Sequence, residues 1–145
     1  MSGVDRWRAN RLTVGPSGAV HAVLERSRAG RRAVERSLGE LPAGTPVVLA
    51  AAAPGAIRRC SAFASRTRVE VQREYLAFPT AAAPAYLVED APATVLLFVR
   101  NVLIAPPGSP WAAPLEACFG VLRALGTWRL VRLVAPGRVI VGKRT

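Results

Sequence analysis

The sequence predicts an α/β fold, a small mixed sheet with helices on its faces, and three observations predict this class. An apolar run from Val47 to Ala53 is typical of a strand buried on both faces. Helical spacing of apolar residues occurs before and after this run, and an alternating stretch follows at Val69 to Phe78. The 145 residues, 51% of them hydrophobic, suffice for one ordinary core, so we expect a single domain over 1–145.

The first expected elements are a hairpin and a helix. Arg11 to Val14 and Ala19 to Leu24 should pair as strands across a turn at Gly15 to Gly18. From Gly30 to Leu41 apolar residues recur at helical spacing, and arginines occupy the other side. This pattern predicts an amphipathic helix of about three turns.

The middle of the chain has the order strand, helix, strand, which is typical of a βαβ-like unit. After Val47 to Ala53, a Pro-Gly pair opens a second helix with apolar residues on one side. The third segment, Val69 to Phe78, alternates apolar and polar residues with a period of two. That period places Glu70 and Glu74 together on the solvent side of the strand.

A loop at Pro79 to Pro84 precedes a brief edge strand, expected at Tyr86 to Val88. Asp90 is suited to cap a helix by accepting a backbone N–H, and Pro92 is tolerated in its first turn. This helix should run to about Ile104 and end at the proline-rich segment 105–110.

The last expected elements are a helix and a terminal β-hairpin. Pro114 to Leu125 has leucines along one side of a helix. Trp128 to Val134 and Arg138 to Val141 should be the two strands of the hairpin, around a type II turn with Pro136 and Gly137 at its centre. A second interpretation, in which Trp128 to Leu133 completes the preceding helix, fits the same residues.

Composition excludes several classes of protein and site. Cys60 and Cys118 lie in apolar helical patterns, so we expect two reduced, buried core residues in a cytoplasmic protein. With His21 as the single His, a zinc site cannot be assembled from His and Cys, and no metal is expected. The start of the chain lacks the apolar segment of a secretory signal. No apolar run approaches the roughly 20 residues that span a bilayer.

Residue patterns do not identify a catalytic site. A nucleotide cradle needs several glycines, but the turn before the second helix offers only Gly55. His21 has no serine elbow beside it in sequence, so a structural role is expected for it rather than base catalysis. The acidic residues at 70, 74, 89 and 90 could include an acid–base pair, but their spacing does not single one out.

The positive charges are concentrated at the two ends of the chain. The formal net charge is +11, residues 37–109 are nearly neutral, and all but one of the basic residues are Arg. If the ends meet in space, one face would attract phosphates of a sugar, a lipid surface or nucleic acid. Few aromatic residues are available for base stacking, which makes nucleic acid the least favoured partner. Candidate anion-binding residues are Arg31, Arg32, Arg129, Arg132, Arg138 and Lys143.

One stretch resembles a known family. Arg73 to Pro84 reads REYLAFPTAAAP, a strand ending in aromatic-x-Ala-Phe-Pro with a further Pro five residues on. It is similar to the C-terminal half of class I S-adenosylmethionine-dependent methyltransferases of bacterial surface-glycan biosynthesis. The resemblance implies a Rossmann-like partial fold, in which Val47 to Phe78 and Trp128 to Val141 look like the late strands and the closing hairpin.

The family's cofactor loop is missing from this chain. Its members bind the methyl donor through a glycine-rich loop after the first strand and an acidic residue ending the second, and neither pattern is present. No cofactor-binding residue is therefore carried over, and S-adenosylmethionine is expected only if a partner chain completes the site. The resemblance implies an accessory or degenerate methyltransferase-like domain that recognises a substrate in glycan or envelope biosynthesis.

The alternative function is a basic binding module for anionic lipid surfaces or nucleic acid. The segment Leu115 to Val134, with arginines beside an apolar side, could lie on a membrane surface, which would make the protein peripheral at the membrane. Gly120 and Gly126 weaken it as an independent helix, so a core helix with solvated arginines is the simpler interpretation.

Overall fold

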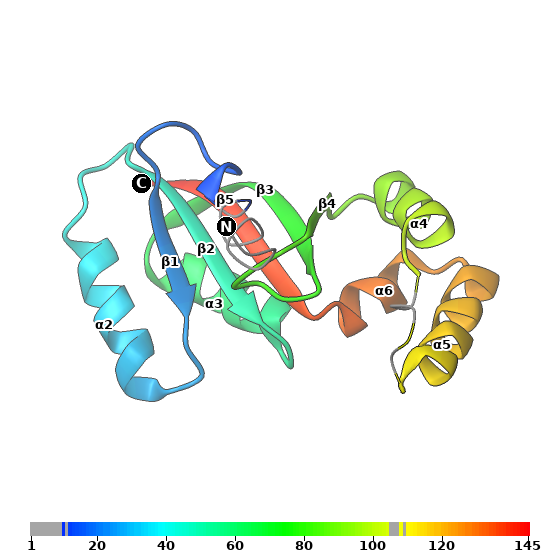
Figure 1. Cartoon of the computed structure of the whole chain (residues 1–145). Coiled ribbons are helices and arrows are strands. Elements are labelled where there is room, and N and C mark those ends of the chain that lie inside the picture. Colours follow the sequence, from blue (N-terminus) through cyan, green and yellow to red (C-terminus); the bar gives the residue numbers. More distant parts are fainter. Residues whose placement is uncertain (1–9, 11, 105–107, 109) are drawn as a thin grey trace.

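The computed structural model describes residue 10, residues 12–104, residue 108 and residues 110–145. Its centre is a five-stranded mixed sheet, accompanied by helices, so the predicted α/β class is confirmed (Figure 1). The strands are β1 (Val20–Leu24), β2 (Pro46–Ala52), β3 (Val69–Phe78), β4 (Tyr86–Glu89) and β5 (Gly137–Arg144). The helices are α2 (Arg28–Gly39), α3 (Ala56–Arg66), α4 (Pro92–Asn101), α5 (Ala112–Leu125) and α6 (Trp128–Val134).

The strands lie in the order β1-β2-β5-β3-β4. β1 and β2 are parallel and are joined through α2, whereas β5 runs antiparallel to both of its neighbours, β2 and β3. β4 pairs with β3 at the edge, as the sequence predicts. β2 and β3 therefore run in the same direction on either side of β5, and α3 connects them.

The expected N-terminal hairpin is wrong. Residues 12–15 do not form a strand, and Arg11 lies outside the described residues. β1 pairs instead with β2, with His21 opposite Val48 in the parallel register. The apolar side chains of β1 pack into the core beside those of β2, which gains more burial than a two-stranded ribbon would.

The expected terminal hairpin is also wrong, and the alternative interpretation of Trp128 to Leu133 comes closer. These residues form a separate helix, α6, because Gly126 ends α5 with a φ of 58° and Thr127 is extended. Gly137 does not adopt positive φ and begins β5. A Cβ there would lie 2.6 Å from the Ala81 amide nitrogen, so close packing rather than a turn requires this glycine.

β2 is buried on both faces of the sheet, as predicted. Val47, Leu49 and Ala51 face the core beneath α2 and α3. Val48 and Ala50 face the other side, where side chains from residues 14–19 and 81 cover them. Helices thus cover one face at this strand, and irregular segments contribute to the other.

The helices α4, α5 and α6 pack beside the β3–β4 edge, at the right of Figure 1, and we call them the helical lobe. Their core contains Val95, Val99 and Leu122, and it joins the sheet through Leu76. α5 is thinly packed, since Leu122 is its single buried residue, and Leu125 is exposed.

A one-residue register shift interrupts β3 at Gln72. Before it, Glu70 lies opposite Lys143 of β5, and after it Glu74 lies opposite Ile140. Because opposed residues point to the same face, the extra residue puts Glu70 and Glu74 on opposite faces of the sheet. The prediction that both lie on the solvent side is therefore wrong for Glu74, which turns toward the helices.

Candidate functional site: a pocket at the amino end of α3

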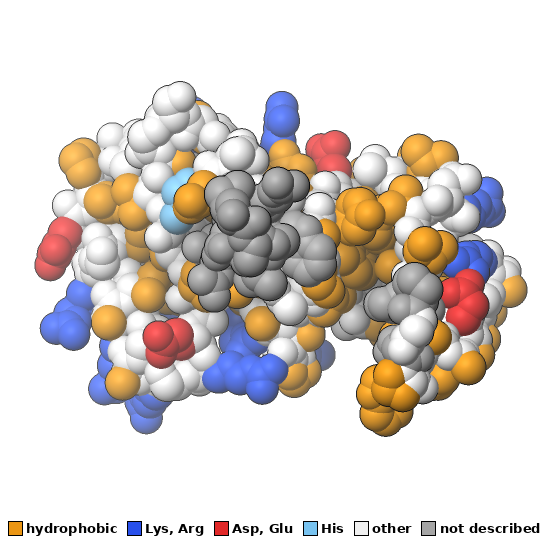
Figure 2. Space-filling model, in the orientation of Figure 1, with side chains coloured by type: hydrophobic (Ala, Val, Ile, Leu, Met, Phe, Trp, Pro, Cys, Tyr) orange, Lys and Arg blue, Asp and Glu red, His pale blue; other side chains and the backbone are white. Residues whose placement is uncertain are grey.

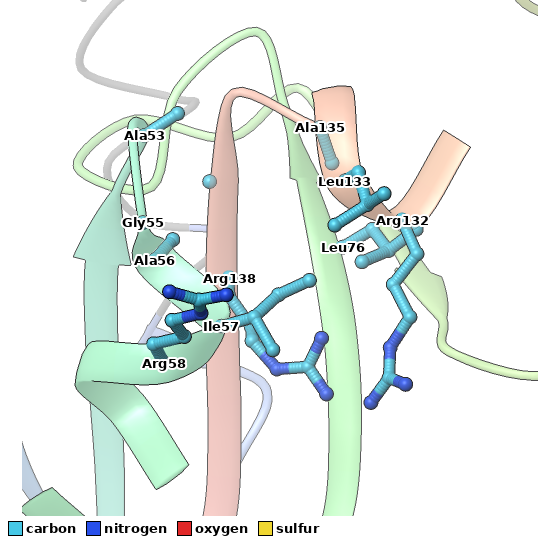
Figure 3. Close-up of a pocket in the computed structure, with 11 residues that line it drawn as sticks. Ala53, Gly55, Ala56, Ile57, Arg58, Leu76, Arg132, Leu133, Ala135 and Arg138 are labelled. Carbon is cyan, nitrogen blue, oxygen red and sulfur yellow. The ribbon is translucent and has the colours of Figure 1, made fainter. Parts of the chain in front are cut away.

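A pocket of about 300 Å³ lies between the amino end of α3, the start of β5 and the end of α6. It is at the carboxyl end of β2, a place where open α/β sheets commonly bind ligands. Arg58 comes from α3, Arg132 from α6 and Arg138 from β5, as Figure 3 shows. The remaining wall is mostly apolar and consists of Ala53, Gly55, Ala56, Ile57, Leu76, Leu133, Ala135 and Gly137. We call it the α3 pocket.

The amino end of α3 contributes backbone donors to this pocket. Gly55 is the N-cap with a φ of 75°, and it has no side chain that could accept a hydrogen bond from the first turn. The amides of Ala56, Ile57 and Arg58 have no partner within the helix, because its first intrahelical donor is Arg59. No acidic residue lies in this turn, so the positive end of the helix dipole is left for a ligand.

Beside the pocket, five side chains form a partly buried polar group that we call the ion cluster: Glu74, Asp90, Trp128, Arg132 and Arg138. Nη2 of Arg138 contacts Oε2 of Glu74 and lies 2.9 Å from Oδ2 of Asp90. Nε of Arg132 donates to the same Asp90 oxygen at 2.7 Å, and Nε1 of Trp128 donates to Oδ1 of Asp90 at 2.8 Å. The two carboxylates thus balance the two guanidinium charges.

Arg138 is the most deeply buried member of this group. Its side chain is 1% exposed, and burial lowers the pKa of its guanidinium from the ordinary value for arginine. Its Nε and Nη1 atoms are buried without a hydrogen-bond partner among the described residues. Because a buried donor without an acceptor is costly, these two atoms add to the cost of burying Arg138.

The structure brings two pairs of the predicted anion-binding residues together but not all six. Arg132 and Arg138 line the α3 pocket. Arg31 and Arg32 lie in a second hollow on α2. Arg129, on α6, and Lys143, on β5, are exposed and line neither of these two sites.

Three site features escaped the sequence analysis. Asp90 does not cap α4, whose N-cap is Ala91, because its carboxylate is engaged by the ion cluster. Glu74 reaches the cluster through the register shift, which no local pattern indicates. Arg58 is exposed and lines the pocket, a role that the sequence analysis did not assign to it; the position of the Pro-Gly turn at the end of a buried strand was the available signal for a site.

The two cysteines differ in environment. Neither forms a disulfide, as expected, and Cys60 is buried on the inner face of α3. Burial raises the pKa of the Cys60 thiol to about 11, although the nearby Arg138 and Arg59 oppose that rise. The expectation of burial is wrong for Cys118, which is exposed on α5 because that helix packs through few residues.

Several arginines stabilise the fold by donating to carbonyl groups at the ends of helices. Arg144 donates to Thr67 at 2.7 Å and to Gly39 at 3.2 Å, where α3 and α2 end. Arg123 donates to Val99 and Leu103 around the end of α4. Cations at helix C-termini are favourable, so part of the arginine excess is structural.

Comparison of the chain with protein-family models, curated proteins and solved structures finds no match. Within the described ranges, no group of three or more His, Cys, Asp or Glu side chains is placed to hold a metal ion. None of the helices seen in that part of the chain is both long enough and apolar enough to cross a membrane.

Proposed function

We propose that this chain is an accessory ligand-recognition domain that binds a small anionic molecule in the α3 pocket. The observation that carries the proposal is the convergence of the uncapped amino end of α3 with three arginines, Arg58, Arg132 and Arg138, around one hollow. Oriented amides and guanidinium groups are the donors that phosphate and carboxylate ligands prefer.

The apolar wall of the pocket indicates the chemical character of the part of the ligand that does not carry the charge. Ile57, Leu76 and Leu133 offer apolar surface within one hollow of about 300 Å³. Glu74 and Asp90 already balance Arg132 and Arg138, which leaves Arg58 and the helix dipole as the net positive charge. A single anionic group attached to a compact apolar body therefore fits better than a polyanion.

The sequence resemblance suggests the setting in which such a domain would act. As an accessory domain of surface-glycan or envelope biosynthesis, it would recognise a substrate in the cytoplasm or at the membrane surface. A partner chain would supply the glycine-rich loop for S-adenosylmethionine. If the assembly is an enzyme, it would then be a methyltransferase-like transferase that depends on this partner.

Calorimetric titration of the purified chain tests the binding proposal. We would use hexyl phosphate and hexanoate as probes, at low ionic strength. Arg58→Ala removes the solvent-facing cation of the pocket and should weaken binding about tenfold, the effect of losing one charge-assisted hydrogen bond. Arg129→Ala is the matched control, because it removes an exposed charge from α6 outside the pocket.

Two outcomes would overturn the binding proposal: no saturable binding of either probe, or equal weakening in the two variants. S-adenosylmethionine titrated alone should give no heat. Micromolar binding of that cofactor by the isolated chain would contradict the accessory role, because it would mean that no partner is needed.

A further inference from the structure

A second basic hollow lies on the other side of the molecule from the helical lobe, on α2. It has a volume of about 230 Å³ and is lined by Arg28, Arg31, Arg32, Glu35 and Arg66, which we call the arginine hollow. Figure 2 shows basic side chains gathered along the lower left of the molecule, over this helix. The arginine hollow and the α3 pocket share no lining residue, so ligand binding in the hollow is independent of the proposed function.

The hollow is built by helix geometry. Residues 28, 31, 32 and 35 have the i, i+3 and i+4 spacings that place side chains on one helical face. Arg66 reaches this face from the last turn of α3, with its Nε 3.5 Å from Oε1 of Glu35. Two helices therefore present four guanidinium groups around one carboxylate.

Most of this charge is not neutralised within the protein. Glu35 contacts Arg66, and Arg31 donates to the carbonyl of Arg26. Neither the Arg28 nor the Arg32 side chain has a hydrogen bond or ion pair with any residue in the described part of the chain. Glu25 is the other nearby carboxylate, and it accepts a hydrogen bond from the Ser27 hydroxyl at 3.0 Å.

The amino end of α2 adds to this positive field. Its first turn contains no acidic residue, and the Ser27 side chain accepts from Gly30, which satisfies one of the free amides. Arg28 lies in this first turn, so the dipole and the side-chain charges act in the same direction.

We propose that the arginine hollow binds a phosphomonoester group. Planar guanidinium forks match phosphate oxygens, and four of them against the carboxylates of Glu35 and Glu25 leave an excess of positive charge that favours a dianion over a monoanion. The volume of the hollow suits one compact group. Among the residues that the structure describes, no aromatic side chain lines it, so this lining lacks the stacking surface that single-stranded nucleic acid uses.

The phosphomonoester could belong to a soluble metabolite or to the headgroup of a lipid such as phosphatidic acid. The chemistry recognised is the same in both cases. Backbone amide shifts of residues 28–32, measured by NMR during titration with inorganic phosphate, would report on the site directly. Co-sedimentation with phosphatidylcholine vesicles, with and without phosphatidic acid, would then distinguish the lipid from the soluble source.

A double substitution, Arg28→Ala with Arg32→Ala, tests the assignment. It should weaken phosphate binding more than about tenfold, since two charge-assisted contacts are lost. Arg36→Ala with Arg129→Ala is the matched control, because it removes two exposed charges outside the hollow and keeps the net charge equal. The control should change the affinity less than about twofold if the binding is local.

The phosphate titration can be interpreted independently of the α3 pocket, because Arg58→Ala should leave the backbone amide shifts of residues 28–32 unchanged. Three outcomes would overturn the inference: no saturation of these shifts by phosphate, equal weakening in the control, or tighter binding of duplex DNA than of phosphate. Saturation with selective loss in the hollow variant would support it, whichever source the vesicle experiment indicates.

Discussion

The ion cluster and the arginine hollow contain the same side chain in opposite environments. Arg138 is 1% exposed, and its guanidinium contacts two carboxylates. Arg28 and Arg32 are exposed on α2, and they have no partner within the described ranges. The first group neutralises its charges internally, whereas the second leaves them to the solvent.

This difference follows from the cost of removing charge from water. A buried ion is tolerated only with compensating partners, so Arg138 requires Glu74 and Asp90. A solvated arginine needs none, and its contribution to folding is small. The cluster should therefore matter for stability and the hollow for binding.

The largest expected effect is that of Arg138→Met, which removes the buried cation and keeps an apolar side chain of similar length. Glu74 and Asp90 lose their shared partner, and breaking a buried pair on one side typically costs about 3–5 kcal/mol. Urea denaturation should show this loss in the free energy of unfolding, with Arg129→Ala within about 0.5 kcal/mol of the original protein. A loss below about 1 kcal/mol would mean that Arg138 is not needed to compensate the carboxylates.

An intermediate effect is expected for the buried thiol beside the cluster. The raised folded-state pKa of Cys60, about 11 against 9.0, means that the folded state holds its proton more tightly than the unfolded state. The stabilising contribution is complete below about pH 9 and is lost as pH rises toward 11, by roughly 2–3 kcal/mol at most.

Unfolding free energies measured at pH 8 and pH 10.5 would check this, with Cys60→Ala as the control. The variant should lose less stability than the original protein over that interval. Thiol labelling at pH 8 gives an independent measurement, because Cys118 is exposed and should react first. Equal labelling rates at the two cysteines in the folded protein would contradict the burial of Cys60.

The smallest effect on stability is expected in the arginine hollow. Arg28→Ala with Arg32→Ala removes two solvated charges of like sign from one helical face, so the free energy of unfolding should change by less than about 0.5 kcal/mol. Thermal denaturation at low and at moderate salt would measure it. Destabilisation comparable to that of Arg138→Met would remove the distinction between the two regions.

Local patterns predicted most of the individual elements. The run Val47 to Ala53 corresponds to β2, and the helix predicted from Gly30 corresponds to α2 within about two residues. Both were predictable because burial and the helical period show in the pattern of residues that are close together in the sequence. The parallel pairing of β1 with β2 was missed, since a strand's partner depends on residues far away in the chain.

The candidate site was less accessible to prediction for the same reason. Arg132 and Arg138 were named from charge alone, but their carboxylate partners were not. Glu74 reaches them only because of the register shift at Gln72, and Asp90 was assigned a local capping role that competes with a distant contact. The spacing of residues in the sequence shows which side chains share a face of one helix or strand. It does not show which side chains meet across the sheet.

The central position of β5 has a consequence for how the protein folds. β2 and β3 are both hydrogen-bonded to this strand and not to each other, although they are much closer to one another in the chain. Such long-range pairing slows folding, because distant segments lose conformational entropy in coming together before their contacts stabilise the chain. A polypeptide truncated before Gly137 would contain two separate strand pairs, β1–β2 and β3–β4, with unpaired edges. We expect this form to aggregate unless a peptide with the sequence of β5 is added.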